Sequence, residues 1–479
     1  MENTKRASWS GQLAFVLAAA ASAIGLGNLW RFPYLAAQYG GGTFILIYLA
    51  LVVTLGFTLM LTEIAIGRKT RQSQLTAYSQ LHRGWGFIGV LGTIIPLLIV
   101  PYYCVIGGWV VYYFKAYCQM AFTGANLMGV AAADSGTFFS SFISSPFAPY
   151  GYAMVFVVSC AAVIMLGVKN GIEKSNLVMM PILFLMAIAI SVYVVAMPGS
   201  GEGLKYYLVP NMNCLTGADG KFSIALLGKT LLGATGQMFY SLSLAMGIMI
   251  TYGSYMKKGD SIEKCVRRIE IFDTFIAFVA GLMIIPVVYL FAVKTGTPVS
   301  EAMNAGPGLM FITLPKVFAS LGSSGAFVGM AFFLLVVFAA ATSAISLYEA
   351  CVASACDLLK LNRKAATFFT GAMILFISVF SALGYGAWSK ITLFGMQFLD
   401  FFDFITNSVL MPIVAAVTCI FVGWVLKPRA VVEECESGGT VMKAKAFYSF
   451  MVRYLAPALM VALLVSEVCR ALKIGGWSI

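Results

Sequence analysis

Long apolar stretches recur along the whole chain, and polar residues are concentrated in the short segments between them. Each stretch is long enough, at roughly 20 residues, to cross the hydrocarbon core of a bilayer as a helix. A membrane β-barrel would instead alternate apolar and polar positions. We therefore predict an all-α polytopic membrane protein with eleven transmembrane helices. The predicted spans run at about residues 12–37, 42–67, 87–122, 151–167, 177–198, 227–255, 262–293, 324–357, 366–385, 391–426 and 446–470.

The distribution of charge fits this prediction and indicates an orientation. Only 10% of the residues are charged, against roughly a quarter in a soluble domain. The net charge of +12 would suggest nucleic acid in a soluble protein, but these basic residues lie in short loops, so the expected partner is the lipid bilayer. Loops on the N-terminal side carry more than twice as many Lys and Arg residues as the opposite loops. The N-terminus is thus predicted to be cytoplasmic and the C-terminus outside the cell (inner) membrane.

Two predicted spans are interrupted at mid-membrane depth. The first carries the sequence SAIGLGN at residues 22–28, and the sixth carries SLSLAMG at residues 241–247. Glycine and small polar residues weaken a helix, and paired interruptions in two halves of a chain indicate a transporter binding site. The alternative is close helix packing through small residues. The predicted domains are two five-helix repeats, residues 1–200 and 201–428, followed by a loop and last span at residues 429–479.

Charged residues inside the predicted spans need partners, because a charge in the hydrocarbon core is costly. Arg31 lies in the outer part of the first span, and its candidate partners are Asp403 and Asp400 in the tenth. Two more acids are Asp273 in the seventh span and Glu63 in the second. We interpret Glu63 as structural, capping the backbone amides of a broken helix.

Several motifs in order resemble one family. The sequence GLGNLWRFPY at residues 25–34, followed by three glycines at 40–42, resembles the first-span signature of the neurotransmitter:sodium symporters, the LeuT-type carriers. Similar stretches follow at residues 102–103, 236–243, 273–274, 339–347 and 399–403. The resemblance covers nearly the whole chain and is closest to the bacterial amino-acid transporter branch. It implies the LeuT-type fold, a 5+5 inverted repeat with helices 1 and 6 broken, and sodium-coupled symport by alternating access.

The resemblance also implies two sodium ions and no organic cofactor. The first ion would be held by the Ala23 carbonyl, by the side chains of Asn28, Ser241 and Asp273, and by the carboxylate of the substrate. The second ion would be held by the carbonyls of Ala21, Ile24 and Ala339 and by the hydroxyls of Thr342 and Ser343. The alternative for these two hydroxyls is back-bonding to the preceding helical turn.

The substrate implied by the resemblance is an amino acid bound between the broken helices. Free amides near a helix N-terminus suit a carboxylate, and the Tyr103 hydroxyl is the expected second donor. Amine carriers of the family use an acid near Gly25, which this chain lacks, so the substrate is expected to bring its own carboxylate. The mostly apolar site favours neutral, hydrophobic or aromatic amino acids. Its residues are expected to be Ala23, Gly25, Leu26, Gly27, Ile99, Tyr103, Tyr240, Ser241, Ser243, Met246, Ser343 and Leu347.

Two gates are implied in the same way. On the outer side, Arg31 and Asp403 would close the vestibule, with Gln237 beside Arg31 and Tyr240 as a hydrophobic lid. On the inner side, Arg6 and Asp357 would pair, with Tyr255 and Trp9 next to them.

Asp273 bears on chloride dependence, because some relatives have asparagine at this position. Chloride-dependent relatives have a serine one helical turn further along, where this chain has Ala277. A carboxylate at the first sodium site offsets one cation without a mobile anion, so transport is predicted to be chloride-independent. The same carboxylate is expected to take up a proton when sodium leaves.

Two other classes of function fit the sequence less well. A proton- or exchange-driven carrier on the same architecture would be favoured by a lysine near the second sodium site, and Thr342 and Ser343 argue against it. A membrane enzyme or a channel is disfavoured because His82 is the only histidine, no carboxylates are paired in sequence, and no pore-filter repeat is visible. We therefore predict that the protein is not an enzyme.

Overall fold

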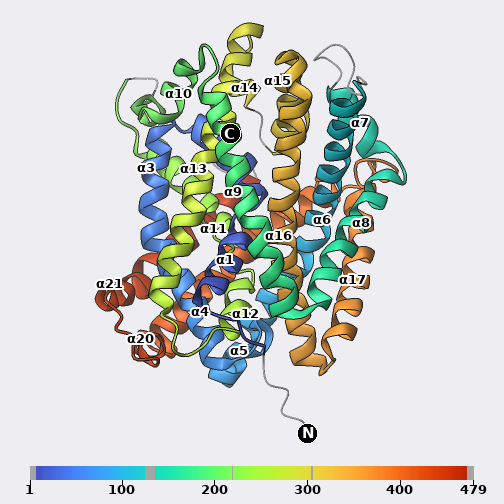
Figure 1. Ribbon diagram of the computed structural model, residues 1–479. Helices are drawn as coiled ribbons and strands as arrows, with labels where there is room; N and C mark the ends of the chain where they lie inside the picture. The colour runs from blue at the N-terminus through green and yellow to red at the C-terminus, as the bar shows by residue number, and fades with distance from the viewer. Residues whose placement is uncertain (1–6, 125–134, 218–219, 304–305, 472–479) are drawn as a thin grey trace.

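The computed structural model describes residues 7–124, 135–217, 220–303 and 306–471. Within these ranges the chain is almost entirely helical, and its β pairing is limited to three isolated bridges. Figure 1 shows the long helices running side by side as one bundle. Helices satisfy most of their backbone polar groups within their own segment, which suits a lipid environment.

Nine helical segments are long and apolar enough to cross a membrane without a sharp break. They are Gly42–Thr70, Arg83–Thr123, Ala148–Met165, Val168–Val195, Ile262–Thr295, Gly325–Leu359, Arg363–Leu383, Phe398–Val425 and Lys445–Arg470. A tenth is the pair Gln12–Ala23 and Gly27–Gln38, which is bent by 53°. Two further apolar helices, α11 (Ile224–Ser241) and α12 (Ile248–Ser254), are separated by six non-helical residues. These two helices occupy the predicted sixth span.

Several of these segments consist of two or more shorter helices, whose labels are used below. The first span is α1 (Gln12–Ala23), η1 (Gly27–Arg31) and α2 (Phe32–Gln38), and the second is α3 (Gly42–Leu51), η2 (Val52–Gly56) and α4 (Phe57–Thr70). The later spans contain α6 (Gly86–Thr123), α8 (Ala148–Met165), η4 (Val168–Glu173) with α9 (Lys174–Val195), α13 (Ile262–Thr295), α16 (Gly325–Leu359), α17 (Arg363–Leu383), α18 (Phe398–Asp403) with η8 (Phe404–Leu410), α19 (Met411–Ile420) and η9 (Phe421–Val425), and α21 (Lys445–Phe450) with η10 (Met451–Leu455) and α22 (Ala456–Ala471).

Two predicted boundaries are wrong by more than a helical turn. The fifth span begins at Val168 rather than near residue 177, because its first turns carry Lys169, Glu173 and Lys174, which a search for apolar runs excludes. The tenth span begins at Phe398 rather than near residue 391. The residues before it form a turn, with positive φ at Phe394 and Gly395.

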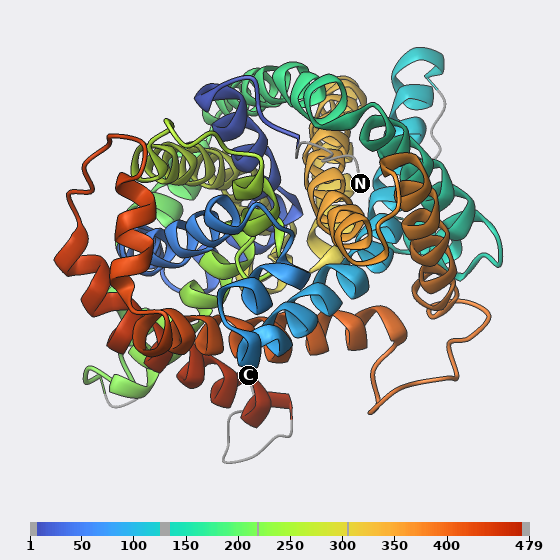
Figure 2. The same cartoon turned by 90° about the horizontal axis from the view of Figure 1, so that it is seen from below.

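The broken helices lie inside the bundle. Figure 1 shows α1, α11 and α12 surrounded by longer helices, and the view from below in Figure 2 shows α12 next to α4. The turn of α1 that leads to its break consists of four fully buried alanines, residues 18–21. Such small side chains let neighbouring backbones approach closely within a membrane. The interior therefore contains two discontinuous helices in direct contact with continuous ones.

Short helices cover both ends of the bundle, and the hydrophobic pattern did not predict them. On the side of the N-terminus are α5 (Gln74–Leu81) and α20 (Pro428–Glu436), and on the opposite side are α7 (Ser135–Ser144), α10 (Ser200–Leu208), α14 (Val299–Ala302) and α15 (Leu314–Ser320). The two sides match the two sets of loops that the alternating spans predict. The boundaries of the two inverted repeats, at residues 200 and 428, stay a prediction.

Candidate transport site between the broken helices

The break in the first span depends on two glycines that contact neighbouring side chains. A Cβ added to Gly25 would lie 2.6 Å from the Ser343 hydroxyl oxygen, and one added to Gly27 would lie 2.6 Å from the Tyr240 ring. Both distances are too short for a real Cβ contact. The backbone of the first span therefore approaches α16 and α11 more closely than any other residue type would permit.

The break in the sixth span is held in an unusual backbone conformation. Ser243, Ala245 and Gly247 all have positive φ, at 54°, 58° and 75°, and the left-handed region is costly for residues that have a Cβ. The Ala245 amide donates to Glu63 Oε1 on α4 at 2.6 Å. The prediction that Glu63 caps the amides of a broken helix is confirmed.

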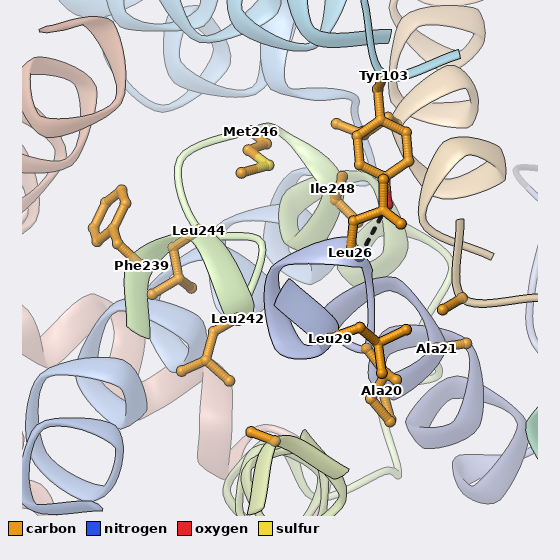
Figure 3. Close-up of a cluster of buried hydrophobic side chains, with 14 of the residues drawn as sticks. Ala20, Ala21, Leu26, Leu29, Tyr103, Phe239, Leu242, Leu244, Met246 and Ile248 are labelled. Atoms are coloured by element: carbon orange, nitrogen blue, oxygen red, sulfur yellow. Dashed lines mark hydrogen bonds between the residues drawn. The ribbon is translucent and has the colours of Figure 1, made fainter. Parts of the chain in front are cut away.

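A buried cavity lies between the two breaks, and the twelve predicted substrate residues all line it. Ser22, Asn28 and Ile248 complete the wall. Figure 3 shows Tyr103 and Leu26 pointing toward one another; the Leu26 amide donates to the Tyr103 hydroxyl at 3.4 Å. Of the added residues, Ile248 follows Gly247 directly, so its position after the break was a usable sequence signal. Whether the twelve bind substrate stays a prediction.

The residues predicted for the first sodium ion converge on Asp273, whose side chain is completely buried. The Asn28 amide donates to Asp273 Oδ1 at 2.8 Å, and the Ser241 hydroxyl lies 2.9 and 3.1 Å from the two carboxylate oxygens. Ala23, the fourth predicted ligand, lines the adjoining cavity. The Tyr48 hydroxyl donates to Oδ2 at 3.1 Å, a partner that the sequence analysis missed because nothing in its spacing indicates which way Tyr48 faces.

The residues predicted for the second sodium ion are also close together, and their hydroxyls donate hydrogen bonds to backbone carbonyls. Thr342 donates to the carbonyls of Phe338 and Ala339 at 3.0 and 3.1 Å, which is the back-bonding that the sequence analysis considered as the alternative. Ser343 donates to the Ser22 carbonyl at 3.0 Å. Ser243 donates to the same carbonyl at 3.1 Å, so Ser22 is a further polar residue of this region that the sequence analysis missed.

The break in α1 changes which backbone carbonyls accept hydrogen bonds from within the helix. The Gly25 amide donates to the Ala23 carbonyl rather than to Ala21, four residues before it, and the Leu26 amide turns to Tyr103. The carbonyl of Ala21 is therefore released from its regular helical bond, while Ile24 is a buried residue at the break itself. A set made only of carbonyl, hydroxyl, amide and carboxylate oxygens suits a hard cation, so both residue sets fit sodium.

The residues predicted for the outer gate do not include a direct Arg31–Asp403 ion pair within the described part of the chain. Asp403 accepts bonds from the Tyr102 hydroxyl at 3.1 Å and the Asn407 amide at 2.6 Å. The Arg31 guanidinium lies 5.9 Å from the centre of the Tyr240 ring, and the ion pairs found in the described part of the chain do not include Arg31 with Asp403. Gln237 donates to the Gly27 carbonyl at 3.1 Å. Closure by an Arg31–Asp403 pair stays a prediction.

At the predicted inner gate, Arg6 lies outside the described residues. Asp357 accepts a bond from the Ser73 amide at 2.6 Å. Trp9 is fully buried; its amide donates to the Tyr255 carbonyl at 3.1 Å, and the two rings meet edge to face. The predicted neighbours Trp9 and Tyr255 are thus in contact.

The sequence analysis missed an ion pair directly beside Tyr255. The Tyr255 hydroxyl donates to Glu349 Oε1 at 2.7 Å, and Arg363 binds both oxygens of Glu349 at 3.0 and 2.6 Å. A second overlooked acid is Glu270, which pairs with Arg267 at 3.2 Å. The spacing of Arg267 and Glu270, three residues apart on a helix, was a usable signal for that pair, whereas Glu349 and Arg363 lie on different helices.

Comparisons with known proteins identify the family to which the chain is similar. The family model described as "Sodium:neurotransmitter symporter family" matches residues 6–126 and 149–476. A sodium-dependent transporter of Bacillus subtilis named YhdH, itself uncharacterized, is 33% identical over 461 residues, which cover 95% of this chain and 96% of the relative. The sodium- and chloride-dependent GABA transporter 2 of Mus musculus is 27% identical over 88% of this chain and 73% of its own length.

Among solved structures, the crystal structure of MhsT in complex with L-phenylalanine matches with a TM-score of 0.83 at 33% sequence identity. The match covers 96% of this chain and 100% of MhsT. The LeuT-type fold predicted from the motifs is therefore confirmed, and so is the prediction of a transporter rather than an enzyme. The chain belongs to the sodium:neurotransmitter symporter family and is a multi-pass, sodium-dependent membrane transporter.

Proposed function

We propose that this protein carries a neutral, hydrophobic or aromatic amino acid across the cell (inner) membrane together with two sodium ions, by alternating access and without chloride. The observation that carries the proposal is the buried carboxylate of Asp273. Its hydrogen bonds in the described part of the chain come from Asn28, Ser241 and Tyr48, all of which are neutral. A buried charge is stable only when it is compensated, and a sodium ion supplies that compensation.

Coupling between ion and substrate follows from the position of this carboxylate. Asn28 and Ser241 contact Asp273 and also line the cavity. A substrate carboxylate in the cavity would complete the oxygen shell of the first ion. Each ligand then binds more tightly when the other is present, and the effect is reciprocal.

The proposed substrate class rests on the composition of the cavity wall. Among the described residues no acidic side chain lines the cavity, and four of the lining residues are the apolar Ile99, Met246, Ile248 and Leu347. The similarity to MhsT, whose structure contains L-phenylalanine, supports this choice.

The proposed cycle uses the two gates. We place the N-terminus in the cytoplasm and the C-terminus outside, following the charge asymmetry of the loops. Arg31 and Asp403 would come together when the outer vestibule closes, over Tyr240. Arg6 and Asp357 would separate when the inner side opens. Sodium must favour the outward-facing and occluded states for transport to be coupled.

The test is ligand-induced thermal stabilisation of the purified protein. The twenty amino acids are screened in sodium and in potassium buffer, since a bound ligand stabilises by RT ln(1 + [L]/Kd). We expect stabilisation by hydrophobic or aromatic amino acids in sodium only. Tryptamine and tyramine should have no effect, because loss of the carboxylate leaves buried donors unpaired. Equal stabilisation in sodium and potassium, or tight binding of the amines, would contradict the proposal.

A further inference from the structure

A second concave site lies on the surface of the bundle that faces the lipid, and it shares no lining residue with the transport cavity. It is a groove of about 590 Å³ between α3 with η2 on one side and α13 on the other, two segments that lie next to each other in Figure 1. Most of its wall is apolar and comes from residues spaced along one face of each helix. They are Ile45, Leu49, Val52, Val53, Ile271 and Phe275. A groove of this composition on a membrane-facing surface suits an acyl chain.

One end of the groove is charged. The side chain of Arg267 is 40% exposed, and that of Glu270 only 4%. Arg267 uses one nitrogen, Nη1, to bind Glu270 Oε2 at 3.2 Å and the Val53 carbonyl at 3.3 Å. Its guanidinium lies 3.9 Å from the centre of the Phe57 ring. The guanidinium is thus held in place while most of its donors remain available to a ligand.

The basic character continues beyond the groove along the same face of α13. Lys264 precedes Arg267 by three residues, and Arg268 precedes Ile271 by three, so the period of the helix puts both on the groove side. Both side chains are exposed, and neither forms an ion pair within the described ranges. Glu263, four residues before Arg267, lies on the same helix face and accepts a bond from the Lys443 amide at 2.9 Å, so three basic side chains stand beside two carboxylates, Glu263 and Glu270.

The length of the groove matches one leaflet of a bilayer. From Arg267 to Phe278 the helix rises by about 16 Å, and half of the hydrocarbon core is about 15 Å. Basic clusters between transmembrane helices at the cytoplasmic side are suited to anionic lipid head groups. We propose that this groove binds one anionic phospholipid, with an acyl chain along Val52 and Phe275 and its phosphate at Arg267, Lys264 and Arg268. The proposed orientation places this lipid in the cytoplasmic leaflet.

The test measures thermal stability of the full chain in vesicles of phosphatidylcholine with and without phosphatidylglycerol of the same acyl chains. Phosphatidylglycerol should raise the apparent melting temperature of the wild type by several degrees. The double variant Lys264→Gln/Arg268→Gln should lose this shift while keeping the wild-type value in pure phosphatidylcholine. Ile271→Trp, which fills the groove from an exposed position, should lose it as well.

The matched control removes the same charge elsewhere on the same side of the membrane. Lys360 and Lys364 are exposed at the ends of α16 and α17, and Lys360→Gln/Lys364→Gln should keep the full shift. The proposal is overturned if the control loses the shift as the groove variant does, or if both groove variants keep it. Inorganic phosphate added to phosphatidylcholine vesicles should not reproduce the shift; an equal effect would show a free-anion site and not a lipid site.

Discussion

Two buried carboxylates of this protein, Asp273 and Glu349, have opposite surroundings. Both side chains are completely buried. Glu349 is bound through two nitrogens by the guanidinium of Arg363 and accepts a further bond from Tyr255. Asp273 receives bonds only from neutral groups among the described residues. The charge of Glu349 is balanced by Arg363, whereas Asp273 has no charged partner among the described residues, and in the proposed function a sodium ion balances it.

This difference matters because a transporter needs charge pairs that hold its helices together without ligand, and also a binding site whose charge is compensated only when the ligand is present. The pair of Arg363 with Glu349 joins α17 to α16 in this structure without any ligand. A buried carboxylate without a cation raises the free energy of the empty state, so the proposed sodium binding at Asp273 would be coupled to conformation.

Removing the cation from the balanced pair should have the largest effect. Arg363→Gln leaves the Glu349 carboxylate buried and uncompensated, which costs about 3–5 kcal/mol of folding stability. Thermal unfolding in detergent should show a strongly lowered melting temperature with and without sodium. The double variant Arg363→Gln/Glu349→Gln removes both charges and should recover much of the loss. A single variant as stable as the wild type would refute the role of this pair.

Neutralising the unbalanced carboxylate should act on sodium rather than on folding. Asp273→Asn replaces a charged ligand, and bonds to charged groups contribute about 1.5–3 kcal/mol. Sodium affinity, measured by titrating substrate binding with sodium, should therefore fall by about tenfold or more. In sodium-free buffer the variant should be at least as stable as the wild type, because the uncompensated charge is gone. Lower stability in sodium-free buffer would indicate a structural role instead.

The second ion site should give a smaller effect. Thr342→Ala removes one neutral oxygen ligand, and a neutral bond is worth about 1 kcal/mol, which corresponds to a several-fold loss of sodium affinity. Thr342→Ser keeps the hydroxyl and should behave like the wild type in the same sodium titration. If Thr342 only back-bonds to Phe338 and Ala339, the alanine variant will leave sodium affinity unchanged.

Chloride should have no effect on the wild type. Uptake into proteoliposomes is measured with chloride replaced by gluconate on both sides, and the rate should stay the same because Asp273 supplies the negative charge. Ala277, which is buried one turn after Asp273, offers no hydroxyl to hold an anion. Asp273→Asn/Ala277→Ser should create a chloride requirement. A several-fold drop in the wild-type rate without chloride would show that the assignment is wrong.

The members of the transport site were more predictable than their contacts. The twelve residues that the family resemblance implied around the substrate line one cavity. The interruptions near Gly25 and Ser243, made of glycines and small polar residues, indicated by themselves only the parts that the two broken spans contribute. The partners of the acids were not predictable in this way. Tyr48 and Asp273 are 225 residues apart, and whether they meet depends on how two helices are rotated about their axes.

The class of the protein, the two interrupted spans and the capping role of Glu63 follow from the amino-acid sequence alone, because they depend on local composition and on the requirement to satisfy backbone groups in lipid. Which charges are balanced depends on the tertiary structure. It joined Glu349 to Arg363, left Arg31 apart from Asp403, turned two hydroxyls onto the Ser22 carbonyl and opened a groove beside Arg267. Such contacts depend on helix rotation and distance within a few ångströms, and neither quantity is encoded in the spacing along the chain.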